Sequence, residues 1–246
     1  MQLQENERLD DLQCKGLKLI QKKDGFRFGA DAVLLADFAD VRKGDRVIDL
    51  GSGTGIIAVL VSAKKSPASV TGLEIQPEIA EMSARSIELN GIGDKVRMVC
   101  GDLRESVKLF GASSFEAVVT NPPYMNRGGG LVNPSDTKAI SRHEILCTLE
   151  DVISAGSRLL TAGGRLSMVH RPERLADIIC LMRANALEPK YLRFVHPLPG
   201  KKPNMILING VRNGRPMLKV LEPLYVYDSV GNYSEEINRI YGRDCQ

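Results

Sequence analysis

The sequence predicts an α/β fold with a doubly wound, mostly parallel sheet of seven strands that ends in a C-terminal antiparallel hairpin. Short β-rich runs alternate with helical stretches from residue 46 onward, and the runs are apolar enough to be covered on both faces. The last two runs are instead joined by a short turn rich in Pro, Gly and Lys, which is typical of a hairpin. With 246 residues, of which 43% are hydrophobic, the chain can bury one core of this size. We therefore expect residues 1–246 to form a single domain, with a flexible polar tail over residues 1–15.

Each element of this fold has its own signals in the sequence. Two helices begin with a proline, Pro77 and Pro172, and a third ends at the pair Gly163-Gly164. The expected strands cover residues 46–50, 69–75, 96–102, 115–123, 164–170, 191–197 and 204–212. The expected helices cover residues 56–65, 77–91, 142–160 and 172–186. The connection over residues 124–141 is long for a compact domain, which favours a functional loop.

The composition argues against several classes of protein. The longest apolar run covers only residues 56–61, too short to span a membrane, and the polar N-terminus has no apolar secretory segment. The five cysteines form no CxxC pair, and the three histidines show no spacing typical of metal ligands. We therefore expect a cytoplasmic protein with reduced cysteines, no membrane association and no metal site.

The basic residues are concentrated in one part of the chain. The net charge is +3, but residues 189–221 contain seven Lys or Arg and no Asp or Glu, so the rest of the chain has a net charge of −4. Such a segment is typical of a surface that faces a polyanion such as RNA, and Lys201 and Lys202 in its turn are candidate substrate contacts. Charged side chains that protect the edge of a sheet explain the same pattern equally well.

A glycine-rich turn follows the first expected strand. Asp49 lies near the end of this strand, and Gly51, Gly53 and Gly55 follow it at alternate positions. In a doubly wound sheet ligands bind at this turn, where glycine lets the backbone approach them closely. Position 56 is isoleucine, so the third glycine of a dinucleotide motif is missing, and a carboxylate beside the turn disfavours phosphate. These residues therefore predict a site for a small ligand that carries an amino or sulfonium cation.

Two more acidic residues stand at the ends of the next strands. Glu74 lies at the end of the second strand, where a carboxylate can accept hydrogen bonds from both hydroxyls of a ribose. Asp102 ends the third strand, where it can accept a hydrogen bond from an adenine amine, and Leu103 beside it is assigned to the same site. Because parallel strand ends lie side by side, we expect these residues to line one crevice with the glycine turn. Taken singly, each acidic residue could instead be an ordinary cap at a strand end.

The sequence Asn121-Pro122-Pro123-Tyr124 follows the fourth strand, beside the same crevice. An aryl amine or amide nitrogen is a poor nucleophile because its lone pair is delocalised. The side-chain oxygen of Asn121 and the carbonyl of Pro122 can accept both N–H bonds of such a group and stabilise positive charge that develops on its nitrogen. The prolines fix the backbone, and Tyr124 offers a face on which a planar group can stack. We expect Asn121, Pro122 and Tyr124 to act in catalysis, Pro123 and Tyr124 to contact the substrate, and Asn121 also to border the ligand at the glycine turn. A plain Pro-Pro turn with a packed tyrosine is the alternative.

Together these motifs resemble those of amino-methyltransferases, which are class I methyltransferases with a Rossmann-like fold. Residues 26–38, FRFGADAVLLADF, narrow the resemblance to the bacterial valine-tRNA adenine-N6 methyltransferase family, and the likeness extends from about Gly16 to Arg212. It implies that the cofactor is S-adenosyl-L-methionine and that the substrate is the exocyclic amine of an adenine in tRNA. It also implies that residues 16–45 are a cofactor-pocket segment, in which Phe28, Gly29 and Asp31 form one wall. Asp31 as a plain cap at the start of a helix remains an alternative.

Four other functions fit parts of the same sequence. A glutamine-N5 methyltransferase of a release factor also carries NPPY. Such enzymes look like a catalytic domain with a helical domain in front of it. Only about 45 residues precede the first expected strand here, too few for that helical domain. The motif of guanine-N2 rRNA methyltransferases more often resembles NPPF than the NPPY of this chain. A non-catalytic RNA-binding module would not need the rigid pair of acceptors at Asn121 and Pro122. A nicotinamide oxidoreductase is disfavoured by Ile56 in place of glycine.

Overall fold

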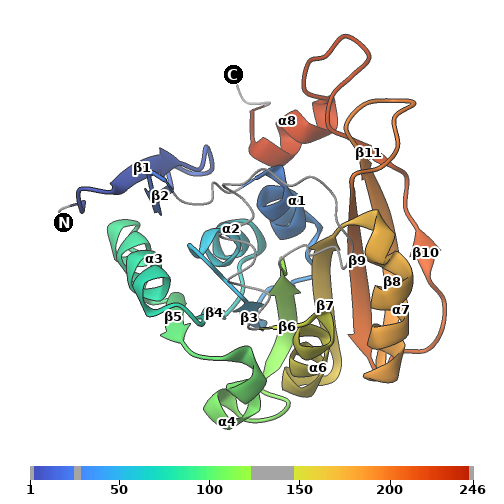
Figure 1. The fold of residues 1–246 in the computed structure, drawn as a ribbon, viewed down its shortest axis with the longest axis horizontal. Coiled ribbons are helices and arrows are strands. Elements are labelled where there is room, and N and C mark those ends of the chain that lie inside the picture. Colours follow the sequence, from blue (N-terminus) through green and yellow to red (C-terminus); the bar gives the residue numbers. More distant parts are fainter. Residues whose placement is uncertain (1–2, 25–28, 123–146, 244–246) are drawn as a thin grey trace.

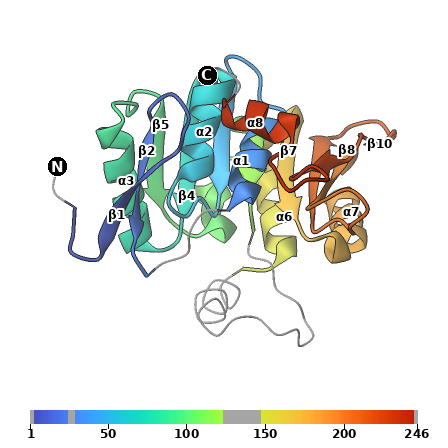
Figure 2. The ribbon, with the colours of Figure 1, turned by 90° about the horizontal axis from the view of Figure 1, so that it is seen from above.

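A mixed sheet of nine strands forms the centre of the molecule, with helices on both of its faces (Figure 1, Figure 2). The computed structural model describes residues 3–24, 29–122 and 147–243. The strands lie in the order β10-β8-β9-β7-β6-β3-β4-β5, and β11 pairs with β8. Their bounds are β3 Arg46–Leu50, β4 Ser69–Glu74, β5 Val96–Cys100, β6 Phe115–Thr120, β7 Leu160–His170, β8 Leu187–His196, β9 Met205–Arg212, β10 Lys219–Val220 and β11 Leu224–Tyr225.

The sheet is parallel from β5 to β7 and becomes antiparallel where β9 lies between β7 and β8. The expected α/β class with a mostly parallel sheet is therefore confirmed. The expected count of seven strands differs from the nine observed, because β10 and β11 add to the outer edge of β8. Each of these two strands is only two residues long, so neither contains enough alternation to be recognised in a sequence.

Two apolar clusters cover the two faces of the sheet. Successive side chains of a strand point to opposite faces, so Val47 joins one cluster and its neighbour Ile48 the other. Helices α1, α2, α3 and α8 contribute to the first cluster, and α4, α6 and α7 to the second. Their bounds are α1 Ala30–Phe38, α2 Ile56–Lys65, α3 Pro77–Leu89, α4 Ser106–Phe110, α6 Leu149–Leu159, α7 Leu175–Ala184 and α8 Glu235–Tyr241, with the 3-10 turns η1 Leu103–Glu105 and η2 Pro172–Arg174.

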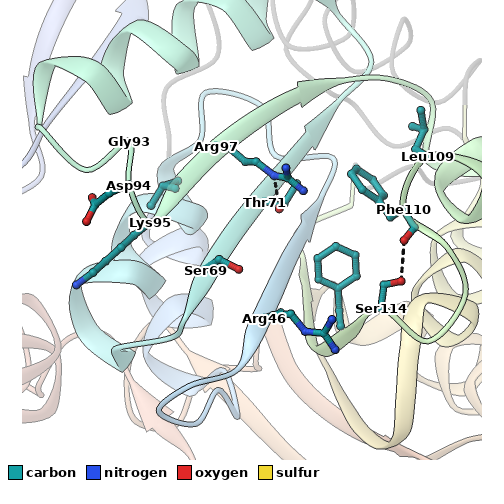
Figure 3. A pocket seen from close by; sticks show the side chains of 12 residues that line it. Arg46, Ser69, Thr71, Gly93, Asp94, Lys95, Arg97, Leu109, Phe110 and Ser114 are labelled. Atoms are coloured by element: carbon teal, nitrogen blue, oxygen red, sulfur yellow. Dashed lines mark hydrogen bonds between the residues drawn. The ribbon is translucent and has the colours of Figure 1, made fainter.

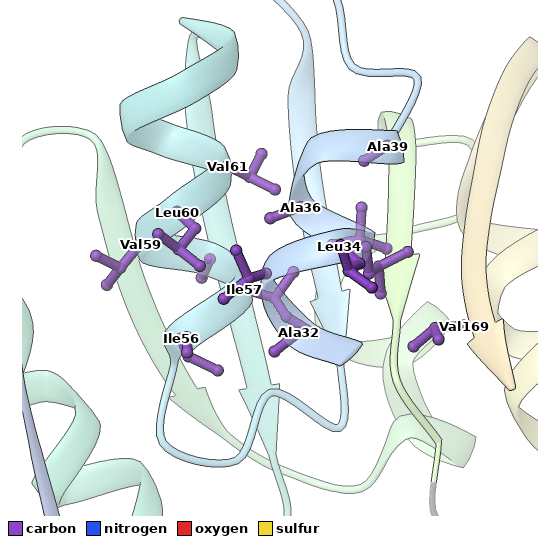
Figure 4. Close-up of a cluster of buried hydrophobic side chains, with 14 of the residues drawn as sticks. Ala32, Leu34, Ala36, Ala39, Ile56, Ile57, Val59, Leu60, Val61 and Val169 are labelled. Carbon is purple, nitrogen blue, oxygen red and sulfur yellow. The ribbon is translucent and has the colours of Figure 1, made fainter. Parts of the chain in front are cut away.

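Helix α1 is buried over most of its length, and Asp37 near its end remains partly exposed. All residues from Asp31 to Ala36 are buried, and the apolar side chains among them pack between α2 and the sheet, as Figure 4 shows for Ala32 and Leu34 beside Ile57 of α2. Helix α8 packs against α1 as well. A helix that is apolar all round is stable only when it is enclosed in this way. The enclosure fixes the position of its first turn, which lies beside the ends of the parallel strands.

The expected flexible tail over residues 1–15 is wrong for the residues that the structure describes there. Residues Glu7–Asp11 form strand β1, which pairs with β2 (Lys18–Lys22) in an antiparallel hairpin that packs against α3. The buried carboxylate of Glu7 accepts a hydrogen bond from Arg85 Nη1 at 2.9 Å. The backbone N–H of Ile20 donates to Ser86 Oγ at 3.0 Å. The hairpin could not be predicted from the polar composition of the segment, because the charge of Glu7 is buried against Arg85, 78 residues away in the chain.

Candidate active site

The ends of β3, β4 and β6 are tied together at one edge of the sheet, which we call the carboxyl edge. The backbone N–H groups of Gly51 and Ser52 both donate to the carbonyl of Leu73, each at 3.0 Å. The buried hydroxyl of Thr120 donates to the carbonyl of Leu50 at 2.9 Å. The turn after β3, the end of β4 and the residues after β6 therefore have fixed positions relative to one another.

The three glycines of this turn all have left-handed backbone conformations. Their φ angles are +70° at Gly51, +54° at Gly53 and +82° at Gly55, a region that favours glycine. A Cβ on Gly55 would also collide with Ser83 Oγ, whereas a Cβ on Gly51 or Gly53 would meet no atom of the described residues within 4 Å. Gly55 therefore serves the packing of α2 on α3. Gly51 and Gly53 instead leave open space beside the backbone.

Asp49 is a fully buried carboxylate behind this turn. Ser52 Oγ donates to its Oδ2 at 2.6 Å, while Oδ1 has no hydrogen-bond partner among the described residues. Burial raises the pKa of Asp49 to about 7, and the nearby charge of Glu74 acts in the same direction. A cation bound beside Asp49 would give Oδ1 the partner that it lacks among the described residues, and it would favour the ionised form of the carboxyl group.

Glu74 is also buried, with 3% of its surface exposed, but its carboxylate is well satisfied. Its Oε2 accepts the backbone N–H of Gly53 at 2.9 Å, and its Oε1 accepts that of Gln76 at 2.9 Å. The side chain therefore joins the glycine turn to the start of α3. Oε1 also accepts a hydrogen bond from Gln76 Nε2 at 3.2 Å, so the second lone pair of Oε2 is the one that can accept a hydrogen bond from a ligand.

Asn121 follows β6 and contacts the N-terminal helix. Its Nδ2 donates to Asp31 Oδ2 at 2.9 Å, and Asp31 Oδ1 accepts the backbone N–H of Ala32 at 2.9 Å. A Cβ on Gly29 would lie 2.8 Å from Asp31 Oδ1, so a side chain at position 29 would press on this carboxylate. Pro122, next to Asn121, is buried. The structure thus brings Gly29, Asp31 and Asn121 together, and their role at a ligand stays a prediction.

Asp102 lies at the end of β5 but is engaged with a neighbour. Its Oδ1 accepts the backbone N–H of Arg104 at 2.9 Å and caps η1, and Arg104 Nε lies 2.9 Å from its Oδ2. Hydrogen bonds from Arg104 lower the pKa of Asp102. Leu103 is half-buried against the second apolar cluster. The assignment of Asp102 and Leu103 to a ligand stays a prediction, and no pattern of residue types indicates the ion pair of Asp102 with Arg104.

Lys201 and Lys202 lie in the turn between β8 and β9, and both are exposed. Because β8 runs in the same direction as β6, this turn follows the carboxyl edge. Three strand spacings separate β8 from β6, which corresponds to roughly 15 Å. The candidate residues Phe28, Pro123 and Tyr124 lie outside the described residues.

The comparisons with known proteins agree with this arrangement. Residues 25–179 match the family described as methyltransferase small domain. The chain belongs to this family. It is 29% identical over 243 residues to a tRNA1(Val) (adenine(37)-N6)-methyltransferase of Porphyromonas gingivalis (strain ATCC 33277), which covers 94% of this chain and 93% of the relative. A protein of the same name from Bacteroides fragilis (strain YCH46) is 27% identical over 197 residues, with 80% and 82% covered. These names confirm the resemblance stated from the motifs.

Solved structures of methyltransferases share the fold. A predicted O-methyltransferase from Agrobacterium tumefaciens superposes with a TM-score of 0.70 at 24% identity, covering 86% of this chain and 95% of that protein. Geranyl diphosphate C-methyltransferase from Streptomyces coelicolor A3(2) superposes with a TM-score of 0.55 at 17% identity, covering 74% and 77%. At these identities the likeness concerns the fold of this methyltransferase and not its substrate.

One hollow among the described residues of this methyltransferase lies away from its candidate site. It has a volume of about 510 Å³ and is lined by residues at the starts of β3 to β6, such as Arg46, Thr71 and Phe115 (Figure 3). Arg97 Nε donates to Thr71 Oγ1 at 3.2 Å within it. Ligands of doubly wound sheets bind at the opposite, carboxyl edge, where Glu74 and Asn121 lie.

Two further properties of this methyltransferase concern the described residues only. None of the helices over residues 3–24, 29–122 and 147–243 is long and apolar enough to cross a membrane. In the same ranges no three His, Cys, Asp or Glu side chains gather in a way that could hold a metal ion.

Proposed function

We propose that this chain is a cytoplasmic methyltransferase of a single domain that transfers a methyl group from S-adenosylmethionine to the exocyclic amine of an adenine in tRNA. The observation that carries the proposal is the amide of Asn121, held by Asp31 at the carboxyl edge next to the glycine turn. The relatives named as tRNA1(Val) (adenine(37)-N6)-methyltransferases support both the type of reaction and the substrate.

The residues at the glycine turn fit the proposed cofactor. Gly51 and Gly53 leave open space where any side chain would project, and Asp49 Oδ1 is a buried acceptor without a partner among the described residues. Asp49 suits the positively charged amino acid part of S-adenosylmethionine, and Glu74 suits the hydroxyls of its ribose. Asp102 and Leu103 are proposed to contact its adenine, with Phe28 and Gly29 in another wall of the cofactor pocket. When bound, the cofactor supplies a methyl group on a sulfonium centre.

The residues after β6 are proposed to prepare the target amine. Asn121 Oδ1 and the carbonyl of Pro122 would each accept one N–H of the adenine amine, which draws electron density onto its nitrogen and orients its lone pair. Both acceptors stabilise the positive charge that develops on that nitrogen as its bond to the methyl carbon forms, while the bond from this carbon to the sulfonium sulfur would break and leave S-adenosylhomocysteine. The nitrogen then releases one of its protons to solvent, so no general base is needed. Pro123 and Tyr124 are proposed to hold the plane of the base.

The experiment that tests this function uses the purified chain, S-adenosylmethionine and unmodified tRNA transcripts. After incubation the tRNA is digested to nucleosides, which are identified by mass spectrometry. We expect N6-methyladenosine in the reaction with the wild-type chain and none with Asn121→Ala. N2-methylguanosine instead, or methylation of a release factor while tRNA stays unmodified, would refute the proposed substrate.

A further inference from the structure

The contact between Asp31 and Asn121 determines which way the asparagine amide faces. The oxygen and the NH2 group of an asparagine have nearly the same shape, so the surrounding hydrogen bonds decide its orientation. An ionised carboxylate has only acceptors and therefore faces the NH2 group. The 2.9 Å bond from Asn121 Nδ2 to Asp31 Oδ2 places Asn121 Oδ1 on the side of the amide turned away from Asp31.

Asp31 is itself held by three independent constraints. It lies in the first turn of α1, whose enclosure by α2, α8 and the sheet fixes its backbone. The N–H of Ala32 binds its Oδ1 at 2.9 Å. The absence of a side chain at Gly29 leaves room for the same oxygen. A carboxylate near the start of a helix is further stabilised by the helix dipole.

We propose that Asp31 is a positioning residue whose function is to keep Asn121 Oδ1 turned toward the amine of the substrate. This inference rests on the proposed function and replaces the cofactor-wall role that the sequence resemblance implied for Asp31. If the amide turned over, its NH2 group would face the N–H bonds of the substrate. Two donors facing each other repel, and the charge that develops on the target nitrogen would lose one of its two acceptors.

The first test replaces Asp31 by a neutral group of the same shape. In Asp31→Asn the side chain offers both a donor and an acceptor to Asn121, so either orientation of the amide is satisfied. We expect kcat to fall roughly 10- to 100-fold, the range for loss of a hydrogen bond to a charged group. The dissociation constant for S-adenosylhomocysteine should stay within about twofold of wild type, since a fall of affinity in parallel with kcat would restore the cofactor-wall role.

Asp37→Asn is the matched control for this variant. Asp37 lies in the same helix, its side chain is 44% exposed, and its carboxylate pairs with Lys64 Nζ at 3.8 Å. The same chemical change at this position should leave kcat unaltered, because exposed pairs contribute little and Asp37 does not contact Asn121. If both variants lose activity equally, the effect belongs to the helix and not to the Asp31–Asn121 contact, and the proposal fails.

The second test exchanges the two partners. Asn121→Asp alone would set two carboxylates against each other and should abolish turnover. When Asp31→Asn is added, the new amide at position 31 donates to the new carboxylate at position 121, so the contact again has one donor and one acceptor. The second oxygen of that carboxylate remains available to the target amine. We expect the double variant to be at least about tenfold more active than the sum of the two single losses would make it, which is a coupling of at least about 1.4 kcal/mol. Additive losses would overturn the proposal.

The third test needs no turnover and stays decisive if the proposed substrate is wrong. The side-chain NH2 group of Asn121 gives a pair of signals in a proton–nitrogen NMR spectrum, which Asn121→Ala identifies by their loss. A hydrogen bond to a carboxylate shifts the bonded proton to lower field, and Asp31→Asn should reverse this shift while Asp37→Asn leaves it. Signals that do not respond to Asp31→Asn would refute the inference, whereas a wild-type chain that does not methylate tRNA adenine refutes the proposed function alone.

Discussion

The fully buried Asp49 has a raised pKa, which makes the stability of the protein depend on pH. The size of this dependence follows from the pKa values of Asp49 in the folded and unfolded states. In the unfolded chain its carboxyl ionises near 3.8, whereas burial raises its pKa in the folded protein to about 7. The folded state therefore holds the proton more tightly than the unfolded state. As the pH rises from about 4 to about 7, the unfolded chain loses this proton first, so the folded protein becomes less stable. Above about pH 7 the loss is complete.

The size of this loss follows from the difference between the two pKa values. A shift from 3.8 to about 7 corresponds to roughly 4 kcal/mol of lost stability at pH 8, of which under about 2 kcal/mol is already lost at pH 5. Asp49→Asn keeps the shape of the side chain and an acceptor for Ser52, but it cannot ionise. Going from pH 5 to pH 8, the variant should therefore gain roughly 2–3 kcal/mol of unfolding free energy relative to wild type.

Urea unfolding followed by far-ultraviolet circular dichroism measures this difference, since the chain contains no tryptophan for fluorescence. The measurement is made without cofactor at four values between pH 5 and pH 8, with Asp37→Asn as an exposed acid in the control. A difference between Asp49→Asn and wild type that stays constant over this range would show that Asp49 does not titrate in it. The same variant should bind S-adenosylhomocysteine more weakly, because the ligand's ammonium group loses its charged partner.

Four more expectations concern single parts of the site. Asn121→Ala should abolish methyl transfer while the affinity for S-adenosylhomocysteine, measured by calorimetry, stays within a few fold; turnover above about a tenth of wild type would exclude the role proposed for its amide. Glu74→Ala should weaken cofactor binding by about 1–3 kcal/mol and recover turnover at saturating cofactor; unchanged affinity would make Glu74 a purely structural residue. Gly55→Ala should destabilise the fold by about 1–3 kcal/mol in urea, because of its φ of +82° and its approach to Ser83; wild-type stability would contradict the packing argument. Replacing Lys201 and Lys202 by Ala should lower the salt dependence of tRNA binding, the slope of log K, by up to about 2, and filter binding that shows an unaltered slope would place the RNA elsewhere.

The parallel part of the fold could be read from the sequence because its signals are local. Strands buried on both faces are continuous apolar runs, and β3 and α2 begin and end where the pattern placed them. Strand β7 begins at Leu160, four residues earlier than expected, because residues 160–163 continue the strand through a Gly-Gly pair that usually ends an element. The N-terminal hairpin gave no such signal, since Glu7 is buried only through its contact with Arg85.

The residues of the candidate site also fall into those that the sequence pattern indicates and those that it does not. Asp49, Glu74 and Asn121 could be grouped from the sequence because β4, β3 and β6 are neighbours, and the connectivity of a doubly wound sheet brings their ends together. The pairing of Asp102 with Arg104 is a matter of side-chain rotamers two residues apart, which no pattern of residue types fixes. Nothing in the sequence distinguishes Ser52, because serine in a glycine turn is common, although its hydroxyl is the partner of Asp49 Oδ2.

The candidate site is held in place by two parts of the fold, the strands of the sheet and helix α1, so a mutation in one part should affect the site differently from a mutation in the other. The proposed cofactor side consists of backbone and buried carboxylates on β3 and β4, which Leu73 and Thr120 tie to the centre of the sheet. The proposed substrate side depends in addition on α1, because Asn121 Nδ2 binds Asp31. Loosening the packing of α1, for example at the fully buried Leu35, should therefore let the Asn121 amide turn before it disturbs the glycine turn. A helix outside the sheet can in this way control reactivity at the target amine while leaving the cofactor in place.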